Sequence, residues 1–135
     1  MQTTKSSTKD LKIHKIIRTL KKNKMLLQQL QSSPETIDFK EVIAYIDENY
    51  DFTPTKFTNG NTVNEAGENN GSCKIFSFAK INNFLKDETL ALFGDFYRTD
   101  VLNNPEGSDH QNIRNFQQFG WDGISFDGEA LKVQG

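Results

Sequence analysis

The sequence GNTVNEAGENNGSCKIFSF, residues 60–78, decides how we expect the chain to fold. Residues 60–72 of this stretch hold four asparagines and three glycines but few apolar side chains. Such a segment buries little and leaves many backbone groups in need of hydrogen bonds, so it predicts an exposed loop. Residues 75–78 are apolar apart from one serine and predict a buried helix. The loop is therefore either an elaborate turn, in which Asn and Gly supply left-handed positions, or one wall of a site.

Charge divides the chain in two. Residues 1–24 carry eight Lys or Arg and one acidic residue, a net charge of about +7. Residues 25–135 carry eight Lys or Arg and seventeen acidic residues, a net charge of about −9. Because an acidic body repels phosphate, we do not expect nucleic acid as a partner. One cysteine cannot form an intramolecular disulfide, and no run of about 18 apolar residues is present, so stable membrane insertion is not expected either.

The aromatic residues set the expected domain boundary, because all of them lie at Phe39 or beyond. A chain of 135 residues has room for one domain, which we place at residues 33–135. Residues 1–32 are then a basic N-terminal extension. Either Met1 or Met25 is the start of the natural protein.

The extension itself predicts a helix. Its first nine residues are rich in Ser, Thr and Lys and are expected to be disordered. Residues 10–31 then place four apolar side chains on one face, which predicts an amphipathic helix with a break near Asn23. These side chains are Ile13, Ile16, Ile17 and Leu20. We expect the helix to dock on the acidic body; a loosely ordered helix and a membrane-surface helix are the alternatives.

The remaining sequence predicts an α+β fold, mostly helical with a small antiparallel sheet. The expected strands are residues 56–58, 62–64 and 123–126, with Asn59-Gly60 as the turn between the first two. The expected helices are residues 39–49 after an Asp38 cap, 73–84 after a Ser72 cap, 87–102, and a last helix from a Ser108 cap to Gly120.

Cys73 and His110 are the residues with the most reactive side chains. Cys73 follows the expected Ser72 cap, where a helix start favours a thiolate. His110, with Asp109 or Asn112 to orient it, would complete a nucleophile, base and orienter. The competing interpretation, which we favour, is a small buried cysteine with no catalytic role. The His, Cys, Asp and Glu residues show no metal-ligand spacing, and the glycines match no phosphate-binding motif, so neither a metal nor a cofactor is expected.

A second polar cluster lies in residues 105–126. Its helix start holds more hydrogen-bonding groups than a cap requires, so we expect it to face loop 60–72 and form a polar pocket, with Trp121 and Tyr50 as apolar walls. The alternative is that these groups serve only as caps and surface ion pairs. The candidate ligand-binding residues are Asn59, Asn64, Glu65, Ser72, Lys74, His110, Arg114 and Trp121.

Five blocks of the sequence resemble the HopJ type III effector family. They are YDFTPTKFTNG (50–60), NEAGENNGSCKIFSFAKI (64–81), TLALFGDFYRTDVL (89–102), PEGSDHQNIRNF (105–116) and GWDGISFDG (120–128). The resemblance covers about residues 25–128. It implies a small bacterial domain associated with type III secretion, and it supplies no catalytic residues to transfer.

We therefore expect a non-catalytic binding domain of the bacterial cytoplasm, with export by a type III system implied by the resemblance. Its expected partner is an unknown protein or a small polar ligand, and the type III secretion apparatus is a further candidate. One alternative is a small enzyme with Cys73 as nucleophile and His110 as base. The other is a cytosolic polar-ligand-binding protein with no role in secretion.

Overall fold

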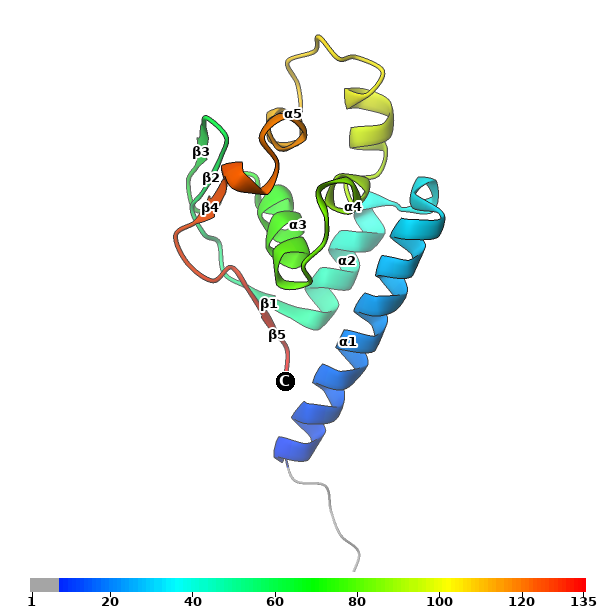
Figure 1. The fold of residues 1–135 in the computed structure, drawn as a ribbon. Helices are drawn as coiled ribbons and strands as arrows, with labels where there is room; N and C mark the ends of the chain where they lie inside the picture. The colour runs from blue at the N-terminus through cyan, green and yellow to red at the C-terminus, as the bar shows by residue number, and fades with distance from the viewer. Residues whose placement is uncertain (1–7) are drawn as a thin grey trace, which may run out of the picture.

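The structure is a computed structural model that describes residues 8–135 (Figure 1). Its long first helix, α1 (Thr8–Ser32), lies along one edge of the molecule, and the other elements form the body beside it. The architecture is α+β, as the sequence predicts. The expected disorder of residues 1–7 lies outside the described residues, and the next two residues are already helical.

Helix α1 corrects two expectations. It continues without a break through Asn23, and it turns a different face to the body, because Thr19, Asn23 and Leu30 are its buried residues. Three of the four residues of the predicted apolar stripe are instead exposed, Ile13, Ile17 and Leu20. The reason is that the body meets α1 with polar side chains. The Asn23 amide donates to the hydroxyl oxygen of Tyr50 (2.8 Å) and to the side-chain oxygen of Asn82 (3.0 Å).

A short 3-10 turn, η1 (Pro34–Thr36), follows, and then helix α2 (Phe39–Asn49) at its predicted position. The Asp38 side chain accepts a hydrogen bond from the backbone N–H of Glu41 at 3.2 Å, which is the predicted cap. Helix α2 runs back along α1, so the two form an antiparallel pair (Figure 1).

The predicted three-stranded sheet is confirmed. Its strands are β2 (Phe57–Asn59), β3 (Thr62–Asn64) and β4 (Ile124–Phe126), antiparallel in the order β3-β2-β4. The turn between β2 and β3 needs Gly60, because its φ is +62° and a Cβ there would lie 2.5 Å from the Phe119 ring. A second sheet was not predicted. It pairs β1 (Tyr50–Phe52) with β5 (Leu131–Val133) near the C-terminus.

Helix α3 (Asn70–Ile81) crosses the middle of the body, and its start differs from the prediction. Ser72 does not cap it. The helix begins three residues earlier than expected, after Asn69, which has a left-handed backbone with a φ of 52°. Cys73 therefore lies one turn inside the helix, where its backbone N–H bonds to the carbonyl of Asn69.

The expected single helix at residues 87–102 is two shorter ones, α4 (Lys86–Ala91) and a π-helical turn, η2 (Phe96–Val101). The chain bends between them at Gly94, which has a φ of +59°. A Cβ on Gly94 would lie 2.9 Å from the backbone nitrogen of Phe39. Close packing of this turn against the start of α2 therefore breaks the helix.

The last helix, α5 (Gln111–Phe119), also starts later than predicted. Ser108 does not cap it; the residue before it is His110, which is left-handed with a φ of 51°. Its end at Gly120, with a φ of +63°, agrees with the prediction. A 3-10 turn, η3 (Gly120–Gly123), leads into β4.

The core lies around α3, where residues 75–79 are buried almost completely. Its largest fully buried side chains are aromatic, and they form a contiguous cluster. They are Phe57, Phe76, Phe78, Phe93 and Phe116. This cluster anchors the β2–β3 hairpin and α5 on α3, and so holds the polar segments before α3 and α5 next to each other.

Candidate functional site

Three buried asparagines join the hairpin to α5. The Asn59 amide donates to the backbone carbonyl of Asn112 (2.8 Å) and to its side-chain oxygen (3.0 Å). Asn64 and Asn112 exchange hydrogen bonds between their side-chain amides, at 2.9 and 3.2 Å. All three residues are at least nine-tenths buried. An amide can donate and accept at the same time, so these asparagines bond to one another without any charge, although the buried side-chain oxygen of Asn59 has no hydrogen-bond partner within residues 8–135.

Two further asparagines extend this network. The Asn69 amide donates to the side-chain oxygen of Asn64 at 2.7 Å, which ties the start of α3 to the hairpin. The Asn115 amide donates to the backbone carbonyl of Asn59 (3.0 Å) and to the Thr62 hydroxyl oxygen (2.9 Å). The asparagines of the polar stretch therefore do more than supply turns, because their side chains connect three elements.

A cavity of about 420 Å³ opens beside this network, which we call the asparagine pocket. It lies between loop 60–72 and the start of α5, the arrangement that the sequence predicts for a polar pocket. Its lining residues are Phe39, Thr62, Asn64, Asn69, Gly71, Ser72, Phe93, Phe96, His110, Gln111, Asn112 and Ile113. Of the candidate ligand-binding residues, Asn64, Ser72 and His110 are among them. Their role in binding stays a prediction.

His110 stands at the rim of the pocket in a defined orientation. Its Nε2 atom lies 2.9 Å from a carboxylate oxygen of Asp100, and its ring packs against that of Phe96 with 5.1 Å between the centroids. Because a carboxylate only accepts, Nε2 is the donor in this hydrogen bond and carries a proton. Asp109 is farther from the ring, at 3.8 Å, so Asp100 and not Asp109 orients it.

Cys73 does not line this pocket. Its side chain is buried, and its thiol donates to the backbone carbonyl of Thr55 at 3.6 Å. Burial raises the pKa of the thiol, which keeps it protonated at neutral pH. Cys73 and His110 thus have separate partners, Thr55 and Asp100, and the hydrogen bond that would join a nucleophile to its base is not formed between them.

The structure places the other candidates elsewhere. Asn59 lies beneath the pocket in the buried network. Glu65 forms a long ion pair with Lys56 (3.9 Å) on the surface, and Lys74 forms one with Asp47 (2.8 Å). Lys74 is not among the residues that line the asparagine pocket.

Arg114 and Trp121 stabilise neighbouring segments. The Arg114 guanidinium donates to the side chain of Asp109 (2.6 Å) and to the backbone carbonyl of Asn104 (2.8 Å), and so closes the loop before α5. Its hydrogen bond lowers the pKa of the Asp109 carboxyl. The Trp121 indole N–H donates to the carbonyl of Phe84 at 2.9 Å. Neither Trp121 nor Tyr50 forms a wall of the asparagine pocket.

The walls are instead Phe39, Phe93 and Phe96, which the sequence analysis did not assign to the site. Phe39 begins α2 and Phe96 begins η2, so both lie far along the chain from loop 60–72. Their contact, with ring centroids 5.0 Å apart, forms only because the bend at Gly94 brings η2 against α2. Sequence patterns could show that these residues are apolar, but they could not show which cavity the residues border.

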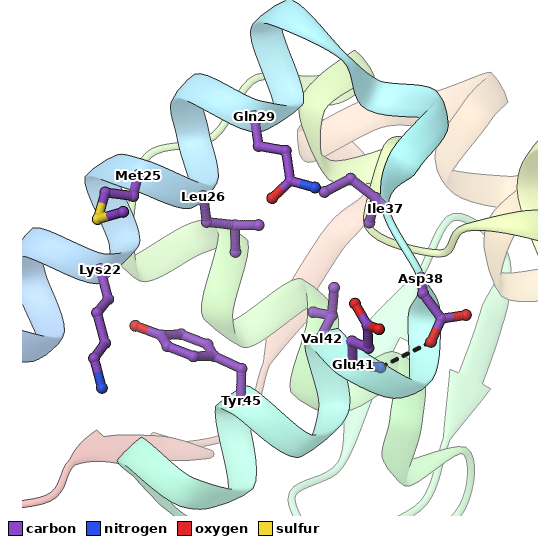
Figure 2. A pocket seen from close by; sticks show the side chains of 9 residues that line it. All are labelled: Lys22, Met25, Leu26, Gln29, Ile37, Asp38, Glu41, Val42 and Tyr45. Carbon is purple, nitrogen blue, oxygen red and sulfur yellow. Dashed lines mark hydrogen bonds between the residues drawn. The ribbon is translucent and has the colours of Figure 1, made fainter.

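A second cavity, of about 450 Å³, lies between α1 and α2 and was not predicted (Figure 2). We call it the α1–α2 groove. Its lining residues are Lys22, Met25, Leu26, Gln29, Ile37, Asp38, Glu41, Val42 and Tyr45. Within residues 8–135, no group of three or more His, Cys, Asp or Glu is arranged to hold a metal ion. The same residues contain no helix with the length and apolar character needed to cross a membrane.

Comparison with known proteins places the chain in a family. Residues 23–131 match the family described as HopJ type III effector protein, and the chain belongs to this family. The chain is also similar to the protein VPA0580, whose function is unknown and whose crystal structure has been determined. The two are 58% identical with a TM-score of 0.80, and the match covers 82% of this chain and 92% of the other. None of the curated proteins matches the chain significantly.

Proposed function

We propose that this protein is a non-catalytic binding domain and that the asparagine pocket holds a small, uncharged polar molecule. One observation carries the proposal: none of the twelve lining residues is Lys, Arg, Asp or Glu. A charged ligand would lose its hydration there without gaining a counter-ion, which is costly. A neutral ligand loses less, and amides and hydroxyls can replace its water.

The lining residues retain hydrogen-bonding capacity for such a ligand. Asn112 uses one amide proton to bond Asn64, which leaves its second proton available. The Ser72 hydroxyl has no partner within residues 8–135. Gln111 uses its amide nitrogen to bond Asn115 and keeps its oxygen as an acceptor. The pocket thus offers both donors and acceptors, which suits a ligand with hydroxyl or amide groups.

Aromatic side chains provide an apolar surface opposite these groups. Phe96 is 40% exposed and borders the pocket, and its ring meets the edge of Phe39. A large apolar side chain that remains exposed at a cavity can gain by burial when a ligand enters. A ligand with a neutral ring would use both surfaces. Its polar groups would bond to Asn112 and Ser72, and the face of its ring would stack on Phe96.

The proposal can be tested with small fragments in an NMR titration of the full chain. The fragment set contains neutral, cationic and anionic forms of the same polar rings. We expect the neutral forms to shift amide signals of residues 62–72 and 110–113, and the charged forms to shift them less. Preferential binding of charged forms, or no fragment binding at these residues, would contradict the proposal.

Two substitutions locate the binding. Phe96→Ala and Gln111→Ala should each weaken the neutral fragments, because they remove the stacking surface and an acceptor. The matched controls are Leu85→Ala, which removes an apolar side chain that is 68% exposed and outside the pocket, and Gln117→Ala, on the exposed side of α5. The controls should bind like the unchanged chain. If all four variants bind equally, the ligand does not use this pocket.

We further propose that the protein is exported by a type III secretion system. The support is the description of its family and the Ser, Thr and Lys content of its first nine residues. A fusion of residues 1–50 to a reporter enzyme tests it in a secretion-competent cell. Export that disappears when the secretion system is inactivated is the expected result, and a reporter that stays inside the cell is the opposing one.

A further inference from the structure

The α1–α2 groove has charged groups of opposite sign at its two ends. Helices α1 and α2 are antiparallel, and hydrogen bonds fix their register. The Tyr45 hydroxyl donates to the backbone carbonyl of Thr19, and the Gln29 amide donates to the Thr36 hydroxyl oxygen. Lys22 of α1 therefore lies at the Tyr45 end of the groove, and the carboxylates at the start of α2 lie at the other end.

Figure 2 shows this arrangement directly. Lys22 and Tyr45 lie toward one end of the groove, and Asp38 and Glu41 lie toward the other. None of the ion pairs within residues 8–135 involves Lys22, Asp38 or Glu41, so these charges are not neutralised by neighbours. Asp38 already accepts the cap hydrogen bond of α2, which leaves Glu41 as the less occupied carboxylate.

The middle of the groove is apolar. Leu26 and Val42 face each other across it (Figure 2), and Val42 and Ile37 form its buried floor at 4% and 3% exposure. Met25 is 67% exposed beside them, and methionine adapts its shape to different apolar partners. An occupant that covers Met25 would bury apolar surface that now faces water, whereas Val42 and Ile37 have almost none left to bury.

The length of the groove limits its occupant. Asp38 and Tyr45 are seven residues apart, which corresponds to about 10 Å along a helix that rises about 1.5 Å per residue. An extended peptide of three residues spans about the same distance, at about 3.3–3.6 Å per residue. The stretch of the groove from Asp38 to Tyr45 is thus about the length of a tripeptide.

From this geometry we propose that the α1–α2 groove binds a short apolar peptide segment with a positive charge at one end and a negative charge at the other. The positive end lies at Glu41 and Asp38, the negative end lies at Lys22, and apolar side chains cover Leu26, Val42 and Met25. Charge complementarity at both ends selects this occupant and its direction. The proposal is independent of the asparagine pocket, which lies on a different set of residues.

The tripeptide Leu-Leu-Leu is a suitable probe, because its free termini supply both charges. It is titrated into the full chain and followed by NMR, together with its N-acetylated, C-amidated and doubly capped forms. We expect saturable shifts at residues 22–29 and 37–45. Each cap should weaken binding about two- to fivefold, the size expected for one solvent-exposed ion pair.

Charge-removing variants then assign each end. Glu41→Gln should weaken the free peptide and reduce the effect of N-acetylation, because only the Asp38 carboxylate then remains at that end, while the effect of C-amidation is unchanged. Lys22→Gln should do the reverse. Glu48→Gln and Lys24→Gln are matched controls, because both residues are exposed and lie outside the groove, and they should leave all four affinities unchanged.

Three results would overturn the proposal. One is the lack of a saturable shift up to the solubility limit of the peptide. Another is equal affinity for the free and doubly capped peptides, which would reflect apolar adhesion alone. The third is an equal response of groove and control variants. All four substitutions are on the surface, and circular dichroism of each variant shows that it is folded before the titration.

Discussion

Asn112 is the residue on which the polar network depends most. Its side chain accepts from Asn59 and Asn64 and donates to Asn64. We expect Asn112→Ala to lower the free energy of unfolding by about 2–3 kcal/mol, because it leaves buried amide groups without partners. Urea unfolding followed by the fluorescence of Trp121, the single tryptophan, measures this.

The control for this change is Asn61→Ala, in the exposed turn of the same hairpin. Its effect should lie within about 0.5 kcal/mol, as for other surface substitutions. A loss for Asn112→Ala that is no larger than the loss for Asn61→Ala would mean that the network does not stabilise the fold.

Cys73 makes the stability depend on pH in a definite direction. Burial raises the pKa of its thiol in the folded protein, whereas the thiol of the unfolded chain ionises near pH 8.5. Above that pH the unfolded chain releases its proton first, so the free energy of unfolding falls as pH rises. Below the unfolded pKa both states are protonated and the contribution of the thiol is complete.

We therefore expect Cys73→Ala to flatten the decrease in stability between about pH 7 and about pH 9.5. Urea unfolding of both proteins at these two pH values measures it. The range ends there because burial also raises the pKa of Tyr45, which adds a slope of the same sign at higher pH. Parallel pH dependences of the two proteins would contradict the expectation, as would rapid alkylation of the native thiol at neutral pH.

At the scale of elements, Gly94 separates α4 from η2. We expect Gly94→Ala to destabilise the protein without lengthening either helix, because the new Cβ would meet the backbone of Phe39. A left-handed backbone costs an ordinary residue about 1–2 kcal/mol. The collision should add at least about 1 kcal/mol, as overpacking does elsewhere.

Gly67→Ala provides the matched comparison. Gly67 also has a positive φ, of +93°, but nothing lies within 4 Å of the position of its Cβ. Because Gly67 has the less favourable φ for alanine, a larger loss for Gly94→Ala than for Gly67→Ala indicates the collision. Equal losses, or a rise in helical circular dichroism for Gly94→Ala, would show that the bend has another cause.

The first residues of the helices were the positions that sequence patterns predicted least well. Ser72 and Ser108 are ordinary capping residues, yet α3 and α5 begin after Asn69 and His110. Both of these residues have a left-handed backbone, a conformation that residues other than glycine adopt uncommonly. Their conformations bring α3 and α5 to the hairpin, where Asn69 bonds Asn64 and His110 borders the pocket. Contacts between distant segments therefore determine where these helices begin.

At the scale of the whole molecule, α1 is held by polar contacts with four other parts of the chain. Asn23 bonds Tyr50, Asn82 and Tyr45, and Lys15 bonds Gln134 near the C-terminus. Removal of residues 1–24 would leave the buried partners of Asn23 unpaired. We expect the shortened protein to lose more than about 2 kcal/mol of unfolding free energy.

The measurement is urea unfolding of the full chain, of the chain without residues 1–24, and of the chain without residues 1–7. The last is the control, because it keeps all of α1. Equal stability of all three would mean that the polar contacts of α1 do not stabilise the body. The same three proteins also bear on the domain boundary expected after residue 32, which stays a prediction. The family match begins before that boundary, at residue 23 within α1.

The sequence by itself determined the family, the α+β class and the three-stranded sheet, and it indicated that loop 60–72 and the start of α5 lie together. These features depend on patterns of neighbouring residues and on long matching blocks. The tertiary structure decided the rest: which face of α1 is buried, the pairing of β1 with β5, the bend at Gly94, and the aromatic wall of the asparagine pocket. Each of these depends on contacts between segments far apart in the chain, whose packing and hydrogen bonding outweigh local preference.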